Sequence, residues 1–115
     1  MRKTLPALLI SFFCGLGSLS SESAVFIKAQ KSCGKWIADQ SSTEAQQASI
    51  PFGAKMWVLG YLSGLVMATN VNALDGVDSD SIFLWVDKYC RSNPLKDTAD
   101  ASLDLFLELK KQKGL

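Results

Sequence analysis

Apolar residues recur at helical spacing in three parts of the chain. The spacing predicts a short helix within residues 25–40, a second helix over 81–91 and a third over 94–111. Strand-like alternation is not visible in the sequence, so the pattern predicts an all-α protein. The apolar faces consist of Cys33, Trp36 and Ile37 in the first helix; Ile82, Trp85, Val86 and Tyr89 in the second; and Leu95, Ala99, Leu103, Phe106, Leu107 and Leu109 in the third.

The ends of two of these helices carry capping residues. Asp78 or Ser79 can cap the second helix, because side-chain oxygens there accept hydrogen bonds from the first free backbone N–H groups. Asn93 is a good N-cap for the third helix, and Pro94 suits its first position, where an N–H group is not needed.

A central run, residues 56–68 (MWVLGYLSGLVMA), is apolar on every side. At about 14 residues between polar neighbours it is too short to cross a bilayer, so we expect a helix buried on most of its surface. Gly60, Gly64 and Ala68 are four residues apart, which predicts a close-packing groove. This groove could receive another helix of the same chain or form the seam of a homodimer.

Residues 1–23 have the pattern of a secretory signal peptide, with a positive start, an apolar run of about 15 residues and then small polar residues. A transmembrane anchor would need roughly 20 apolar residues. Cys14 follows two phenylalanines, which does not suit lipoprotein processing. We therefore expect cleavage between Ser20 and Ala24, a mature domain over 24–115, no stable membrane anchor and a periplasmic location.

Export decides how the remaining cysteines are interpreted. The mature chain keeps only Cys33 and Cys90, and an even pair in an exported protein predicts one disulfide. The bridge would close a loop of about 58 residues, which is worth about 4 kcal/mol in the chain-entropy model. The predicted fold is a small bundle of about four helices closed by this disulfide.

The composition excludes much enzyme chemistry. The chain has no histidine, which removes the usual general base, nucleophile pairs and His-ligated metal sites. A net charge of +1 provides no field for nucleic acid. The acidic residues lie at helix starts and on polar faces, where capping explains them. We expect no catalytic residue, no metal and no cofactor.

Two other clusters have structural explanations. Asp75, Asp78 and Asp80 could suggest a calcium loop, but the glycine and terminal glutamate of that motif are not in place, so capping is favoured. The larger aromatic residues could form a stacking surface for bases or sugars, but core packing is favoured because no basic stripe accompanies them. These are Trp36, Trp57, Tyr61, Trp85, Tyr89 and Phe106.

The charges suggest a response to acid. Protonation of the 11 Asp and Glu residues would leave only positive charges, and the ion pairs and caps that they form would be lost. Loosening would expose the central apolar helix while the disulfide kept it near the helices around Cys33 and Cys90. The residues expected to bind a client or partner protein are Met56, Trp57, Leu59, Tyr61, Leu62, Leu65, Val66 and Met67.

Residues 81–109 (SIFLWVDKYCRSNPLKDTADASLDLFLEL), together with Cys33 near the mature start, resemble the HdeA/HdeB family of small periplasmic acid-stress chaperones. The Cys-Gly-x-Trp, GYLSG and WVDKYC-x-x-NPL segments also resemble uncharacterised exported bacterial proteins. The resemblance implies a helical domain bridged by Cys33 and Cys90, often dimeric at neutral pH, that disorders in acid and holds unfolded clients.

A second resemblance is to small exported helical immunity proteins that neutralise cell-wall-degrading toxins, which also use a GY-x-x-G-like helix and a disulfide. It implies a rigid toxin-binding surface, built from loops such as residues 39–49 and 70–80, and no role for acid. Both resemblances predict binding of proteins without catalysis.

Overall fold

The computed structural model describes residues 26–40 and 50–115. The predicted signal peptide (1–23) and residues 41–49 of the predicted polar loop lie outside the described residues. Within the described ranges the regular structure is helical, apart from one isolated bridge between Ser32 and Asp97. The all-α prediction is therefore confirmed.

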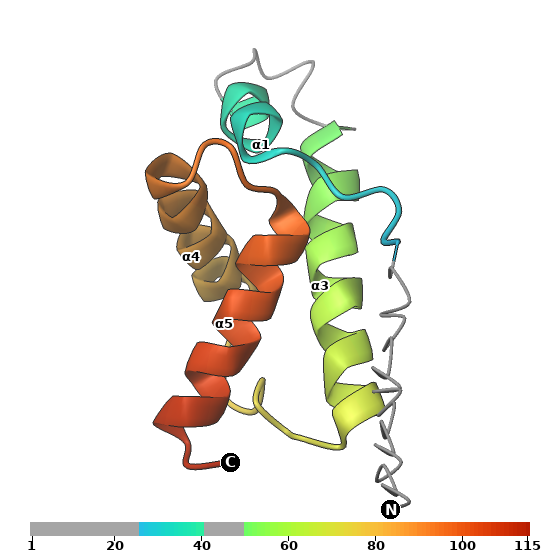
Figure 1. Ribbon diagram of the computed structural model, residues 1–115, viewed down its shortest axis with the longest axis vertical. Coiled ribbons are helices and arrows are strands. Elements are labelled where there is room, and N and C mark those ends of the chain that lie inside the picture. The colour runs from blue at the N-terminus through green and yellow to red at the C-terminus, as the bar shows by residue number, and fades with distance from the viewer. Residues whose placement is uncertain (1–25, 41–49) are drawn as a thin grey trace, which may run out of the picture.

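The described residues form four helices: α1 (Cys33–Gln40), α3 (Ile50–Thr69), α4 (Ser79–Ser92) and α5 (Thr98–Gln112). α5 lies between α3 and α4, and the short α1 lies across one end of these three (Figure 1). α1 contacts both α3 and α4, and α5 contacts the same two helices along their length. The bundle thus has one core, with α5 at its centre.

The core is built from short apolar stretches of every described helix. Val58 and Leu62 of α3 and Val86 of α4 are fully buried, and they meet Leu105 and Phe106 of α5. Burial of side chains of this size stabilises a fold by roughly 1.5–3 kcal/mol each. The other buried apolar residues of the cluster are Cys33, Trp36, Ala73, Ile82, Cys90 and Ala101.

The first helix is shorter than predicted. Residues 26–32 are not helical, and α1 begins at Cys33. The backbone N–H of Cys33 donates to the carbonyl oxygen of Lys96 at 2.8 Å, and the N–H of Thr98 donates to that of Lys31 at 2.8 Å. These long-range bonds satisfy the segment before α1 in place of helical bonds, and they join it to the start of α5.

The predicted start of the last helix is wrong by four residues. Asn93 is the C-cap of α4, and α5 begins at Thr98 after the N-cap Asp97. Asp97 accepts from the backbone N–H groups of Ala99 and Asp100, while the Asp100 carboxylate accepts from the N–H of Asp97. This reciprocal capping box satisfies more backbone donors than Asn93 and Pro94 could.

The apolar face predicted for α5 is also partly wrong. Leu103 and Leu107 are exposed, and Leu95 before the helix is 99% exposed. Ala99 and Phe106 of the predicted face are buried, and the buried side also includes Leu105 and three small or polar residues that were not predicted. Its members are Thr98, Ala99, Ala101, Ser102, Leu105 and Phe106.

The predicted disulfide is present between Cys33 at the start of α1 and Cys90 near the end of α4, with Cα atoms 4.7 Å apart. Both residues are buried. The bridge therefore fixes α1 to α4. This matters for α1 because a helix of eight residues is only marginally stable by itself.

Candidate protein-binding surface

α3 is apolar on every side, but only one side of it is buried. Val58 and Leu62 are fully buried against the bundle, whereas Phe52, Met56 and Met67 are 65%, 48% and 84% exposed. The prediction that this helix is buried on most of its surface is therefore wrong. The reason is the architecture: only α1 and α5 cover α3 extensively among the described elements, and both approach it from the same side.

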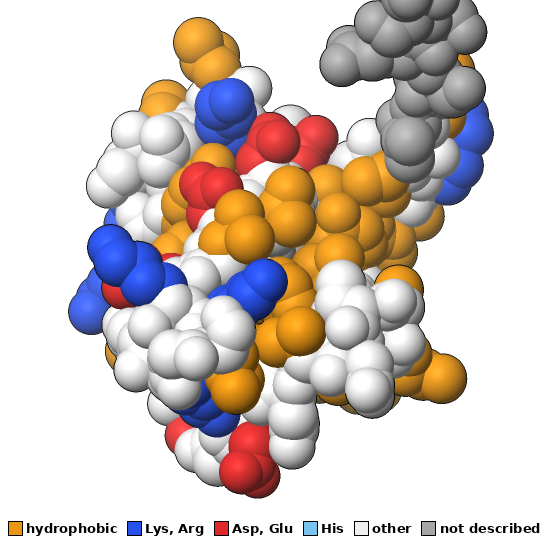
Figure 2. Space-filling view, turned by 60° about the horizontal axis from the view of Figure 1, so that its bottom comes forward, with side chains coloured by type: hydrophobic (Ala, Val, Ile, Leu, Met, Phe, Trp, Pro, Cys, Tyr) orange, Lys and Arg blue, Asp and Glu red, His pale blue; other side chains and the backbone are white. Residues whose placement is uncertain are grey.

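The exposed side of α3 is named here the outer face. It consists of Phe52, Gly53, Met56, Gly60, Ser63, Gly64 and Met67, which are all exposed. None of them is charged, and Lys55 is the one charged residue in the helix. Figure 2 shows hydrophobic side chains gathered in a patch that extends towards the side where α3 lies, with a Lys or Arg side chain within it and acidic side chains at its border. Exposed large apolar side chains on an uncharged helix face are typical of interaction sites.

The glycines of α3 do not form an intramolecular groove with the described residues. Gly60, Gly64 and Ala68 are exposed, and a Cβ atom built at Gly60 or Gly64 would meet no atom within 4 Å. No helix within residues 26–40 or 50–115 therefore occupies the predicted groove. The alternative, a seam between two copies, stays a prediction.

The predicted binding residues of α3 do not share one surface. Met56 and Met67 lie on the outer face, and Leu62 is buried in the core. The others are partly buried at the edges of the packed side, as Trp57, Leu59, Tyr61, Leu65 and Val66. Phe52 belongs to the outer face because α3 begins at Ile50, whereas the predicted binding residues begin at Met56.

Carboxylates hold α1 and the segment before it. Asp39 accepts from Lys31 Nζ at 2.5 Å and from Lys35 Nζ at 2.9 Å. The hydrogen bond from Lys31, followed by that from Lys35, lowers the pKa of Asp39 below its ordinary value of 3.8. Asp39 is therefore ionised at neutral pH and joins the segment before α1 to the end of that helix.

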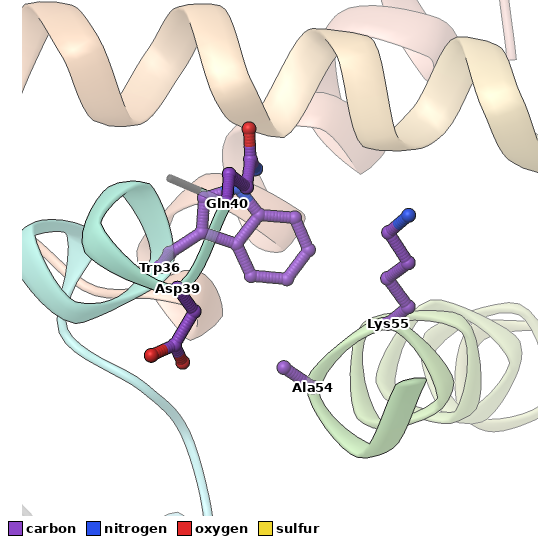
Figure 3. Close-up of a pocket in the computed structure, with 5 residues that line it drawn as sticks. All are labelled: Trp36, Asp39, Gln40, Ala54 and Lys55. Carbon is purple, nitrogen blue, oxygen red and sulfur yellow. The ribbon is translucent and has the colours of Figure 1, made fainter. Parts of the chain in front are cut away.

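A second carboxylate joins α1 to α4. Asp87 Oδ1 accepts from the indole Nε1 of Trp36 at 2.6 Å and also from the Gln40 side chain. The Trp36 ring lies between α1 and α3, while Lys55 of α3 extends towards α4 (Figure 3). Lys55 Nζ is 5.1 Å from the centre of the Phe83 ring, which is a cation–π contact between α3 and α4. The hydrogen bonds to Asp87 help to orient α1 relative to α4.

The cavity beside Trp36 is too small for a substrate. It holds about 10 Å³ between α1 and α3, room for about one water molecule. Within residues 26–40 and 50–115, no group of three or more His, Cys, Asp or Glu side chains is arranged to hold a metal ion.

The Asp78 carboxylate caps α4. It accepts hydrogen bonds from the backbone N–H and the hydroxyl of Ser81, and these bonds lower the pKa of Asp78.

The aromatic residues divide between core and surface. Trp36 and Phe106 are buried, as predicted, whereas Trp57, Tyr61, Trp85 and Tyr89 are only partly buried. The four form two stacked pairs, Trp57–Tyr61 at 5.1 Å and Trp85–Tyr89 at 5.4 Å between ring centres. The i, i+4 spacing of each pair was visible in the sequence, but which side faced solvent was not.

Comparison of the chain with protein-family models, curated proteins and solved structures found no match. In the described part of the chain, α3 included, no helix combines the length and apolar content that a membrane span requires.

Proposed function

We propose that this protein is an exported, non-enzymatic protein-binding molecule that works as an acid-responsive chaperone in the periplasm. The observation that carries the proposal is the outer face of α3, which is uncharged, apolar and exposed while the other side of the helix is packed in the core. Unfolded proteins offer apolar segments that such a face can bind without a specific sequence, and its two methionines adapt to irregular partners.

Acid would enlarge this surface. The folded pKa of Asp39 lies below 3.8, so its ion pairs contribute fully above that pH, and the contribution is lost as pH falls through the folded pKa. α1 then loses the attachment of its end to the segment before it. Release of Trp36 from α3 uncovers the packed side near Ala54, and apolar surface is added next to the outer face.

The disulfide limits how far this opening proceeds. Cys33 stays bound to Cys90 in acid, so α1 remains next to α4 while its other contacts loosen. Refolding at neutral pH then requires only a local docking step, because the two ends of the loop are never far apart. This is the behaviour expected of a chaperone that works through cycles of acidification.

The test is suppression of aggregation. The full mature chain is mixed with acid-unfolded malate dehydrogenase at about pH 3, where carboxylates are largely protonated, and light scattering is followed on neutralisation. Met67→Lys should reduce suppression several-fold, because it places on the outer face a charge that persists at pH 3 and at neutral pH. Leu95→Lys is the matched control: Leu95 is 99% exposed but lies outside that face. Equal suppression by both variants would contradict the proposed surface.

A second candidate is an immunity-type module that binds one folded toxin. The observation that favours it is that the outer face is already exposed in the folded state, when α3 is held rigidly by Val58 and Leu62. Near-ultraviolet circular dichroism across pH separates the two functions. A chaperone should lose tertiary packing in acid as suppression rises, whereas retained packing without suppression would favour the rigid module.

A further inference from the structure

A groove between α4 and α5 lies away from the outer face of α3 and contributes nothing to the function proposed above. Its volume is about 530 Å³, and its lining includes Trp85 and Tyr89 of α4 and Asp104, Glu108 and Lys111 of α5. Small-molecule sites occupy roughly 300–1,000 Å³. The groove is therefore large enough for a ligand of one or two rings.

The α4 side of the groove is aromatic. Trp85 and Tyr89 stack with their ring centres 5.4 Å apart and an angle of 18° between the planes. Both are only partly buried, so ring surface reaches the groove. The indole N–H of Trp36 donates to Asp87, and the indole N–H of Trp57 donates to the carbonyl oxygen of Lys28. The α4 wall thus offers flat aromatic surface, and the indole N–H of Trp85 has no acceptor among the described residues.

The α5 side carries acceptors and a cation together. Asp104 lies beside the Tyr89 hydroxyl, and the Glu108 Oε1 atom accepts from Gln112 Nε2 at 2.9 Å, which leaves its second oxygen for another donor. Lys111 follows about one helical turn after Glu108 and about two turns after Asp104 along the same wall. The α5 wall therefore offers two carboxylates and one ammonium group.

This mixture of groups selects among ligand classes. A cationic ligand would be attracted by the two carboxylates and the rings but repelled by Lys111, and an anion would meet both carboxylates. A neutral polyhydroxylated ligand can use all of them: its hydroxyls donate to Asp104 and Glu108 and accept from Lys111 and the indole N–H, while its C–H face packs on an aromatic ring.

We propose that the groove between α4 and α5 binds a short neutral oligosaccharide, stacked on Trp85 and Tyr89 and hydrogen-bonded to Asp104 and Glu108. The site does not depend on the proposed chaperone function, since it shares no residue with the outer face of α3. It would bring an exported protein to a glycan surface and leave α3 free for protein binding.

The test is calorimetric titration of the full mature chain with chitotriose, cellotriose and maltotriose, each to about 10 mM. At least one should bind with a Kd of about 0.1–1 mM, a range typical of small ligands with few contacts. Because the ligand is neutral, its Kd should be the same in low and high salt. Failure of all three trisaccharides to bind would overturn the proposal.

Variants locate the site. Trp85→Leu keeps an apolar side chain but removes the ring, and should weaken binding by about tenfold or more. Glu108→Ala, on an exposed position where unfolding is not expected, should weaken it several-fold. Leu84→Ala is the matched control, since Leu84 is an exposed neighbour on α4 outside the groove. The proposal would also be overturned if both groove variants bound the trisaccharide as tightly as the wild type. It would equally be overturned if the groove bound the cationic peptide tetra-arginine, with an affinity that falls in high salt, and not the sugars.

Discussion

At the scale of single residues, carboxylates carry much of the specificity of this fold. Asp39, Asp78, Asp87 and Asp97 each hold a particular helix end or segment through hydrogen bonds to named partners. Because the chain has no histidine, carboxylates are the side chains that respond when the pH falls below neutral.

Asp39→Asn should reduce the dependence of stability on acid. The substitution removes the charge that Lys31 and Lys35 stabilise, so the free energy of unfolding at pH 7 should fall by roughly 0.5–1 kcal/mol. As the pH falls through the folded pKa of Asp39, the wild type loses the same contribution and the two proteins should converge. Urea unfolding at a series of pH values measures this, with Asp75→Asn as the control. A constant difference down to pH 2 would contradict the assignment.

Asp97→Ala should destabilise α5 by about 1 kcal/mol, because it removes the side chain that accepts from Ala99 and Asp100. Asp97→Asn is the matched control, since asparagine caps helices almost as well. Thermal unfolding followed by circular dichroism compares the two. Equal melting temperatures for the alanine and asparagine variants would show that the capping box contributes nothing to stability.

At the scale of elements, α3 is the unusual helix, because its composition and its burial disagree. A helix with apolar residues on all sides is expected to be buried, yet the outer face of α3 is exposed along its length. A surface of this kind is costly for an isolated molecule in water, which is consistent with the proposal that it binds other proteins.

Gly60→Ala and Gly64→Ala should each raise the free energy of unfolding by about 0.5–1 kcal/mol, because alanine favours the helix and meets no atom within 4 Å at either position. Gly76→Ala is the contrasting control: its φ of +73° is unfavourable for any residue with a Cβ atom, so this variant should be less stable. Chemical unfolding measures all three. If Gly60→Ala or Gly64→Ala instead lowered the free energy of unfolding, or shifted the protein from dimer to monomer, a second copy of the chain would be indicated as packing on these glycines.

At the scale of the whole molecule, the disulfide joins parts of the fold that are 57 residues apart in sequence. Reduction, or Cys33→Ala with Cys90→Ala, should lower the free energy of unfolding by about 4 kcal/mol in the chain-entropy model. Melting with and without reductant gives the difference, and intact-mass measurement confirms the bridge. A reduced protein that melts at the same temperature as the oxidised one would contradict this role.

The sequence by itself determined the helical class, the approximate positions of α3 and α4 and, to within one residue, the N-cap of α4. These features depend on neighbours three or four residues apart. The pairing of Cys33 with Cys90 was predicted from export and from the expected removal of the segment that contains Cys14, and the bridge is present in the structure. The α3 pattern was unambiguous as a helix because few residues interrupt it, but a uniformly apolar helix contains no period that marks its buried side.

Only the tertiary structure decided which surfaces are exposed and where the segment before α1 attaches. The bonds of Lys31 and Cys33 to the start of α5 join residues more than sixty positions apart, and no local pattern specifies them. The placement of α5 between α3 and α4 decided which of its residues are buried and left the outer face of α3 uncovered. Which apolar residues meet water is a property of helix arrangement, and local spacing cannot fix it.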